Sequence, residues 1–210
     1  MYVKICGITN ARDALFAVAM GADAVGFVLA ASKRQVDPET LRAITLELPT
    51  DVVTVGVFRN ELPGRILEIV ELAGLRGVQL HGQETPADVA LLRRRVPFLV
   101  QAFTVDDPRL DRVDEYDVDA ILLDSPSPGS GETFDWSGIG SLVESRRVIL
   151  AGGLDHENVA MAIETVRPWG VDVASGVESA PGIKDPVKVR RFIANARTAL
   201  SEFPPDPRSA

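Results

Sequence analysis

Eight short apolar runs recur along the chain, and each is followed by a stretch with the pattern of a helix. The runs are rich in β-branched residues and nearly continuous in apolar side chains, which is typical of strands covered on both faces. They occupy Tyr2–Ile5, Ala24–Leu29, Val52–Phe58, Gly77–Leu80, Phe98–Ala102, Ala120–Leu123, Val148–Leu150 and Val171–Ala174. Strands that alternate with helices predict a parallel sheet of the α/β class.

Signals for helix starts and stops lie between these runs. Thr9 or Asn10 can cap a helix that stops near Gly21. The sequence Asp37-Pro38-Glu39 combines an N-cap, a proline in the first position and an acidic first turn. Later helices are expected to open in the same way at Pro63, Pro86 and Pro186.

Eight such units in 210 residues predict a single (β/α)₈ TIM barrel spanning residues 1–200. An open doubly wound sheet shares the same alternation and is the alternative, but eight short units in a chain of this length favour closure. Residues 201–210 are expected to form a flexible C-terminal tail, because Pro204, Pro205 and Pro207 cannot continue a helix.

Charge and cysteine content limit the classes of function. A net charge of −8 argues against nucleic acid as a partner, although local amides and one arginine can still hold a small anion. The single cysteine, Cys6, excludes an intramolecular disulfide and a multi-cysteine metal site. The start of the chain lacks a signal-peptide pattern, and no apolar run approaches the ~20 residues of a membrane span. We therefore expect a cytoplasmic protein without a membrane partner, and nothing in the sequence requires more than a monomer.

Chemically capable residues come after several of the predicted strands. In a TIM barrel the carboxyl ends of all strands meet at one rim, where active sites are built. The residues expected at this rim are Cys6, Arg34, Arg59, His81 and Asp124, after the first, second, third, fourth and sixth runs. We expect them to surround one site.

Two turns of small residues come after the last two strands. Gly152-Gly153 precedes a helix expected near His156, and Ser175-Gly176 leaves the eighth strand in the same way. Glycine lets backbone amides approach a ligand, and helix N-termini favour phosphate. Either pair of residues alone could serve only to make a tight turn. Together, after the seventh and eighth strands, they predict a phosphate site.

The residues Lys4-Ile5-Cys6-Gly7-Ile8-Thr9 resemble the opening of the phosphoribosylanthranilate isomerases, the aldose–ketose isomerases of tryptophan biosynthesis. The likeness covers about residues 2–198. It continues through Gly21-Ala22-Asp23-Ala24-Val25-Gly26-Phe27, Val55-Gly56-Val57-Phe58, Val78-Gln79-Leu80-His81-Gly82, Leu122-Leu123-Asp124, Gly129-Ser130-Gly131-Glu132-Thr133-Phe134-Asp135-Trp136, Ala151-Gly152-Gly153-Leu154 and Val171-Asp172-Val173-Ala174-Ser175-Gly176-Val177-Glu178.

The resemblance implies the Amadori rearrangement of N-(5′-phosphoribosyl)anthranilate, a small phosphorylated substrate, without metal or cofactor. It implies Cys6 as general base, Asp124 as general acid and Arg34 as a contact to the anthranilate end. The phosphate would be held by Gly152, Gly153, Ser175 and Gly176. The sequence departs from the family at Ala30-Ala31, where an aromatic residue and a proline usually precede the serine, and in the short segment Pro126-Ser127-Pro128. These departures concern the anthranilate pocket more than the chemistry.

Several residues also have structural interpretations. Lys4 shares a strand face with Cys6, so it either points into the barrel and favours the thiolate or pairs with Asp172 on the last strand. His81 is expected to orient a loop rather than to react, and Asp172 to be structural. Asp135-Trp136 is expected to begin a helix.

Rival functions remain open from the residues alone. A catalytically silent phosphosugar-binding barrel would be expected to lose Cys6 or Asp124, and both are present. A metal-dependent phosphosugar epimerase needs a cluster of ligands, but only His81 and His156 are available as histidines. A resemblance to the histidine-pathway isomerases would require a pair of aspartates at the site, whereas here Cys6 follows the first run.

Overall fold

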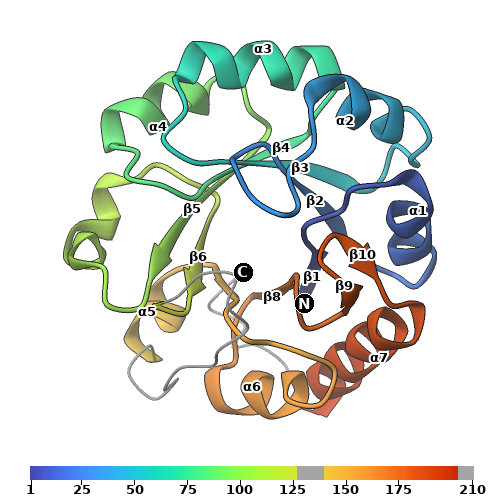
Figure 1. Cartoon of the computed structure of the whole chain (residues 1–210). Helices are drawn as coiled ribbons and strands as arrows, with labels where there is room; N and C mark the ends of the chain where they lie inside the picture. The colour runs from blue at the N-terminus through green and yellow to red at the C-terminus, as the bar shows by residue number, and fades with distance from the viewer. Residues whose placement is uncertain (127–139, 203–210) are drawn as a thin grey trace.

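The computed structural model describes residues 1–126 and 140–202. Eight parallel strands form a closed barrel in sequence order, surrounded by a ring of helices (Figure 1). The strands are β1 Tyr2–Ile5, β2 Ala24–Val28, β3 Val53–Phe58, β4 Gly77–Leu80, β5 Phe98–Thr104, β6 Ala120–Asp124, β7 Val148–Leu150 and β8 Gly170–Val173. The predicted TIM barrel is confirmed, since β8 pairs with β1, with Val3 opposite Val171.

Most of the helices begin where the sequence predicted. The described helices are α1 Ala11–Ala19, α2 Pro38–Thr45, α3 Pro63–Ala73, α4 Pro86–Arg93, α5 Gly140–Ser145, α6 Val159–Val166 and α7 Pro186–Glu202. Asn10, not Thr9, caps α1, because its side chain accepts a hydrogen bond from the Asp13 amide at 2.9 Å. Asp37 caps α2 in the same manner, from the Thr40 amide at 2.8 Å.

The connection after β5 differs from the other units. It is a 3₁₀ helix, η1, over Pro108–Glu115, with non-helical backbone angles at Arg112 (φ −123°, ψ 25°). The Asp107 side chain accepts from the Arg109 amide at 2.8 Å and closes the first turn tightly. This unit is polar and its turns are separated by a kink at Arg112, so it does not form a regular α-helix.

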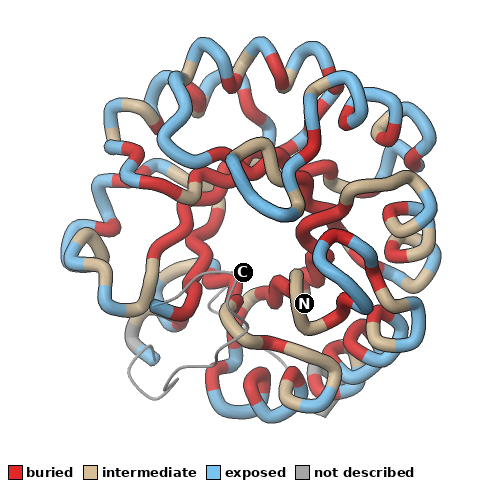
Figure 2. Tube along the Cα trace, in the orientation of Figure 1, coloured by how far each residue is buried: buried red, intermediate tan, exposed pale blue. Residues whose placement is uncertain are grey.

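The hydrophobic core has two parts. The larger part fills the space between the strands and the inner faces of the helices, so the outer faces of the helices are exposed (Figure 2). The smaller part lies within the barrel and includes Tyr2, Val55, Val100 and Leu122. Because strand residues alternate between faces, Lys4 shares the interior face with Tyr2.

The last described element, α7, extends to Glu202 and so includes the first two residues of the segment expected as a tail. Residues 203–210 lie outside the described part of the chain, as does the segment 127–139 with its predicted helix start at Asp135-Trp136. No helix in the described ranges 1–126 and 140–202 has both the length and the apolar character needed to cross a bilayer.

Candidate active site

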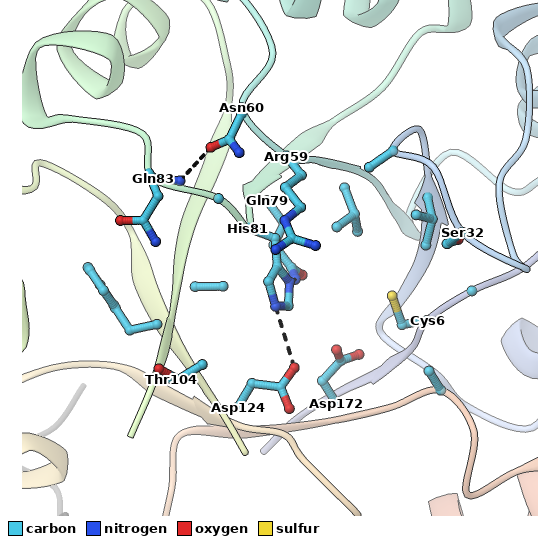
Figure 3. Close-up of a pocket in the computed structure, with 18 of the residues that line it drawn as sticks. Cys6, Ser32, Arg59, Asn60, Gln79, His81, Gln83, Thr104, Asp124 and Asp172 are labelled. Carbon is cyan, nitrogen blue, oxygen red and sulfur yellow. Dashed lines mark hydrogen bonds and ion pairs between the residues drawn. The ribbon is translucent and has the colours of Figure 1, made fainter. Parts of the chain in front are cut away.

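A cavity of about 450 Å³ opens at the carboxyl ends of the strands. All five residues that the sequence placed at this rim line it, namely Cys6, Arg34, Arg59, His81 and Asp124. Figure 3 shows Cys6 and Asp124 approaching the cavity from different sides of the barrel, with Asp172 between them. The structure therefore brings these five residues together around one cavity.

Cys6 comes directly after β1, and its amide donates to the Val173 carbonyl at 2.8 Å, which fixes the end of β1 against β8. Its thiol is buried. Burial raises the pKa of the Cys6 thiol above its ordinary value, and the Asp172 carboxylate adds to this increase. The Lys4 ammonium opposes them by its charge and by a hydrogen bond to the sulfur. A thiolate formed here is therefore a stronger base than that of an exposed cysteine.

Lys4 fulfils both of the roles considered for it. Its Nζ lies 3.0 Å from Oδ1 of Asp172, across the β1–β8 pairing. The same ammonium points into the barrel beside the Cys6 sulfur. Burial lowers the pKa of Lys4, but Asp172 and Cys6 outweigh it and the net direction is upward. Lys4 therefore remains a cation that can stabilise a neighbouring thiolate.

Gly26 on β2 provides the space for this pair, and the sequence pattern gave no sign of that role. A Cβ atom at this position would lie 2.8 Å from the Cys6 sulfur and 3.0 Å from Nζ of Lys4. Real Cβ atoms do not approach other atoms so closely, so any side chain here would displace the thiol or the ammonium.

Asp124 is the last residue of β6, and it faces a histidine. Its Oδ1 accepts from the Ser125 amide at 2.8 Å, while its Oδ2 lies 3.4 Å from Nε2 of His81. Gln79 in turn contacts Nδ1 of His81 through its Nε2 at 2.8 Å. Since Nδ1 accepts from an amide N–H, the neutral imidazole carries its proton on Nε2, toward Asp124. The alternation Gln79-x-His81 at the end of a strand was the available signal for this chain of contacts.

Arg34 lines the cavity but is already engaged by a carboxylate. Its Nε and Nη2 donate to the two oxygens of Glu178, each at 2.8 Å. Glu178 also accepts from Nζ of Lys184 at 2.9 Å. The absence of a side chain at Gly7 leaves room for the Arg34 side chain, because a Cβ at Gly7 would lie 2.6 Å from Cδ of Arg34. The bidentate pair leaves Nη1 as the unengaged end of the guanidinium.

The two glycine turns lie side by side, next to the wall of the cavity. Gly152 packs directly on β6, since a Cβ there would lie 2.4 Å from the Ser125 amide nitrogen. Gly176 pairs with Asp155, and a Cβ on it would lie 2.0 Å from the Leu154 carbonyl. The structure thus brings the two predicted phosphate turns together, with Gly153 and Ser175 in the same two loops.

The two turns lead into different elements. Gly152-Gly153 leads into α6 as expected, but Ser175-Gly176 leads into a hairpin of β9 Glu178–Ala180 and β10 Ile183–Lys184. Pro181-Gly182, with Gly182 at φ +81°, makes the reverse turn of this hairpin, which the sequence pattern did not predict. The helix after the eighth strand begins at Pro186, as expected.

The remaining charges at the cavity include two further arginines. Arg109 pairs with Asp107 and donates to the Gly82 carbonyl at 3.0 Å. The Arg59 side chain has no ion pair or hydrogen bond within residues 1–126 and 140–202. In the same two ranges, no three histidine, cysteine or carboxylate side chains gather closely enough to hold a metal ion.

Comparisons with known proteins agree with this geometry. The family model described as N-(5′-phosphoribosyl)anthranilate (PRA) isomerase matches residues 3–195. An N-(5′-phosphoribosyl)anthranilate isomerase of Pelobacter propionicus is 48% identical over 206 residues, covering 95% of this chain and 97% of the relative.

Two solved structures share the fold and the sequence. The phosphoribosyl anthranilate isomerase of Thermus thermophilus superposes with a TM-score of 0.88 at 43% identity, covering 94% of this chain and 99% of that one. A second isomerase structure, with a TM-score of 0.85 and 45% identity, covers the same shares of the two chains. It holds reduced 1-(o-carboxyphenylamino)-1-deoxyribulose 5-phosphate.

Proposed function

The chain belongs to the N-(5′-phosphoribosyl)anthranilate isomerase family, and on this premise we propose that Cys6 and Asp124 are the general base and general acid of its reaction. The enzyme is an aldose–ketose isomerase of tryptophan biosynthesis. It converts N-(5′-phosphoribosyl)anthranilate into 1-(2-carboxyphenylamino)-1-deoxyribulose 5-phosphate. The observation that carries the proposal is that a buried thiol and a carboxyl group line one cavity at the barrel rim.

Asp124 acts in the first step, which opens the furanose ring. Its carboxyl group gives a proton to the ring oxygen while the bond from that oxygen to C1 breaks. The nitrogen lone pair forms the C1=N bond of a protonated Schiff base. His81, whose Nε2 lies 3.4 Å from Oδ2 of Asp124, is placed to hold the carboxyl group in position for this transfer.

Cys6 acts in the second step, which moves the hydrogen of C2. The thiolate removes this proton, and the electron pair of the C–H bond forms C1=C2 while the nitrogen becomes neutral. The enol hydroxyl then gives its proton back to the Asp124 carboxylate and the Cys6 thiol gives its proton to C1. This leaves a ketone at C2 and a methylene at C1, and it restores both side chains. Lys4 stabilises the thiolate that starts this step. Only protons are transferred, so acid and base side chains supply all the chemistry without a metal or cofactor.

The remaining site residues hold the substrate. Amides of Gly152, Gly153, Ser175 and Gly176 bind the phosphate; the support for this is that the two turns lie side by side and bring their backbones close together. Arg34 contacts the anthranilate end through Nη1, because its other nitrogens hold Glu178.

The whole cavity is built from one chain, and we propose a cytoplasmic monomer whose partner is this small phosphorylated substrate. Sedimentation or size-exclusion measurements on the purified protein test the monomer. A stable dimer would contradict it without affecting the assignment of the catalytic residues.

Loss of substrate fluorescence tests the function directly. Purified protein should consume N-(5′-phosphoribosyl)anthranilate at a rate proportional to enzyme concentration, and Cys6→Ala should abolish this rate while retaining the circular dichroism spectrum of the wild type. Absence of turnover in the folded wild-type protein would contradict the proposed function.

A further inference from the structure

Arg59 is the one arginine of the cavity wall whose side chain is left unpaired within the described residues. The other two are held by carboxylates, Arg34 by Glu178 and Arg109 by Asp107. Arg59 comes directly after β3 and extends from there toward the middle of the cavity (Figure 3). Its planar guanidinium therefore presents free donors to whatever occupies the cavity.

The backbone beside Arg59 is fixed by an unusual turn. Asn60 has a positive φ of 54°, which non-glycine residues seldom adopt. Its amide donates to Glu84 at 2.7 Å, and its side-chain oxygen accepts from the Gln83 amide at 2.7 Å. Glu84 is buried and also accepts from the Gly82 amide at 2.8 Å. These contacts lock the loop after β3 to the loop after β4, so the root of the Arg59 side chain is held in place.

The topology places Arg59 across the cavity from the two glycine turns. In a closed barrel of eight strands in sequence order, β3 lies opposite β7, the strand that precedes Gly152-Gly153. Cys6 and Asp124 come from strands between these two positions on either side. A ligand anchored at the turns by a phosphate and passing between Cys6 and Asp124 would reach Arg59 with its far end.

We propose that Arg59 joins Arg34 in binding the aromatic carboxylate of the substrate and thereby selects the ortho-carboxylated ring. This inference rests on the proposed function, because that function supplies a ligand with a phosphate at one end and a benzoate at the other. Arg34 uses Nε and Nη2 to hold Glu178, so only its Nη1 is left for the ligand. The fork of Arg59 is open, and a guanidinium matches a carboxylate with two parallel hydrogen bonds.

Binding of two matched ligands tests the proposal. The first is the reduced product analogue, reduced 1-(o-carboxyphenylamino)-1-deoxyribulose 5-phosphate, and the second is its phenylamino counterpart, which keeps the phosphate but lacks the carboxylate. Calorimetry measures both ligands on the wild type, Arg59→Met, Arg59→Lys and Arg65→Met. Arg65 lies on α3 in an exposed pair with Glu68, so Arg65→Met controls for the lost charge.

Arg59→Met should raise the dissociation constant of the carboxylated analogue on the order of 10-fold and leave that of the phenylamino ligand unchanged. Arg59→Lys should recover part of the loss, because it keeps the charge without the fork. Arg65→Met should bind both ligands as the wild type does. Equal weakening of both ligands would assign Arg59 to the phosphate or to folding, and no weakening of either would show that it contacts neither end; each result overturns the inference. Wild-type turnover of the substrate, measured first, tests the proposed function separately.

Discussion

Cys6 and Asp124 lie on two sides of the cavity, and their surroundings differ in charge and in exposure to solvent. On the Cys6 side, Lys4 and Asp172 form an ion pair whose side chains are only 1% and 9% exposed, and Gly26 closes tightly over it. On the Asp124 side, the carboxyl group faces His81, whose side chain is 24% exposed. The base thus lies in a dry, charged environment, whereas the acid is linked through an imidazole to a wetter one.

This difference fits what each group must do. A thiolate that removes a carbon-bound proton gains basicity from burial, and a fixed cation nearby keeps its formation feasible. A carboxyl group that gives a proton to the ring oxygen and regains one from the enol hydroxyl must keep its orientation through the cycle, which the contact with His81 provides. The account therefore predicts that the base side is sensitive to packing and charge, and that the acid side depends chiefly on Asp124 itself.

Removal of the thiol is expected to have the largest effect. Cys6→Ala should lower kcat on the order of 10⁴-fold, the upper end for general base catalysis, because Asp172, the carboxylate beside it, is held by Lys4. Single-turnover fluorescence assays measure the loss, with thermal unfolding as the control for folding. A residual rate within about 10-fold of the wild type, on the scale of general base catalysis, would remove Cys6 from the mechanism.

The acid variant should be less severe. Asp124→Asn keeps the shape and loses the transferable proton, so kcat should fall on the order of 10³-fold. His81→Asn should lower kcat much less, because it removes only the contact that orients the carboxyl group. If His81→Asn is as slow as Asp124→Asn, His81 does more than position the acid.

A methyl group at Gly26 should disturb the base side through packing alone. Gly26→Ala places a Cβ 2.8 Å from the Cys6 sulfur, so kcat should fall about 10-fold or more and stability by about 1–3 kcal/mol. Gly64→Ala is the matched control, since nothing lies within 4 Å of a Cβ there and the residue is in α3. That control should leave kcat unchanged and gain stability of up to about 1 kcal/mol. Wild-type kinetics in Gly26→Ala would show that the tight packing has no role in catalysis.

Charge changes beside the thiol should move the pH profile in opposite directions. The thiolate is the active form, so kcat/KM rises with pH until the thiol is ionised. Lys4 lowers the pKa of Cys6, so Lys4→Met should shift this rise to higher pH and slow the enzyme several-fold at neutral pH. Asp172 raises that pKa, so Asp172→Asn should shift the rise to lower pH. Shifts in the same direction for both variants would contradict the electrostatic account of Cys6.

The fold and the gathering of Cys6 and Asp124 at one rim were within reach of the sequence, because apolar runs with helix caps specify a barrel and a barrel gathers its strand ends. The roles proposed for the two residues came from the family resemblance. The partners of those residues were not within reach of the sequence. Glu178 meets Arg34 where Pro181-Gly182 turns the chain into a hairpin, which the sequence pattern did not predict. Gly26 carries no signal of its own in the sequence, and its constraint comes from the atoms that β1 brings against β2. Such contacts depend on register and side-chain direction, which periodicity does not encode.

A crystal structure with the reduced product analogue tests the central claim most directly. The account predicts that C2 of the sugar lies in contact with the Cys6 sulfur, at about 3.5 Å, while the oxygen derived from the ring lies within hydrogen-bond distance of Asp124. A ligand whose C2 faces away from the sulfur, with the phosphate elsewhere than at Gly153 and Gly176, would contradict it.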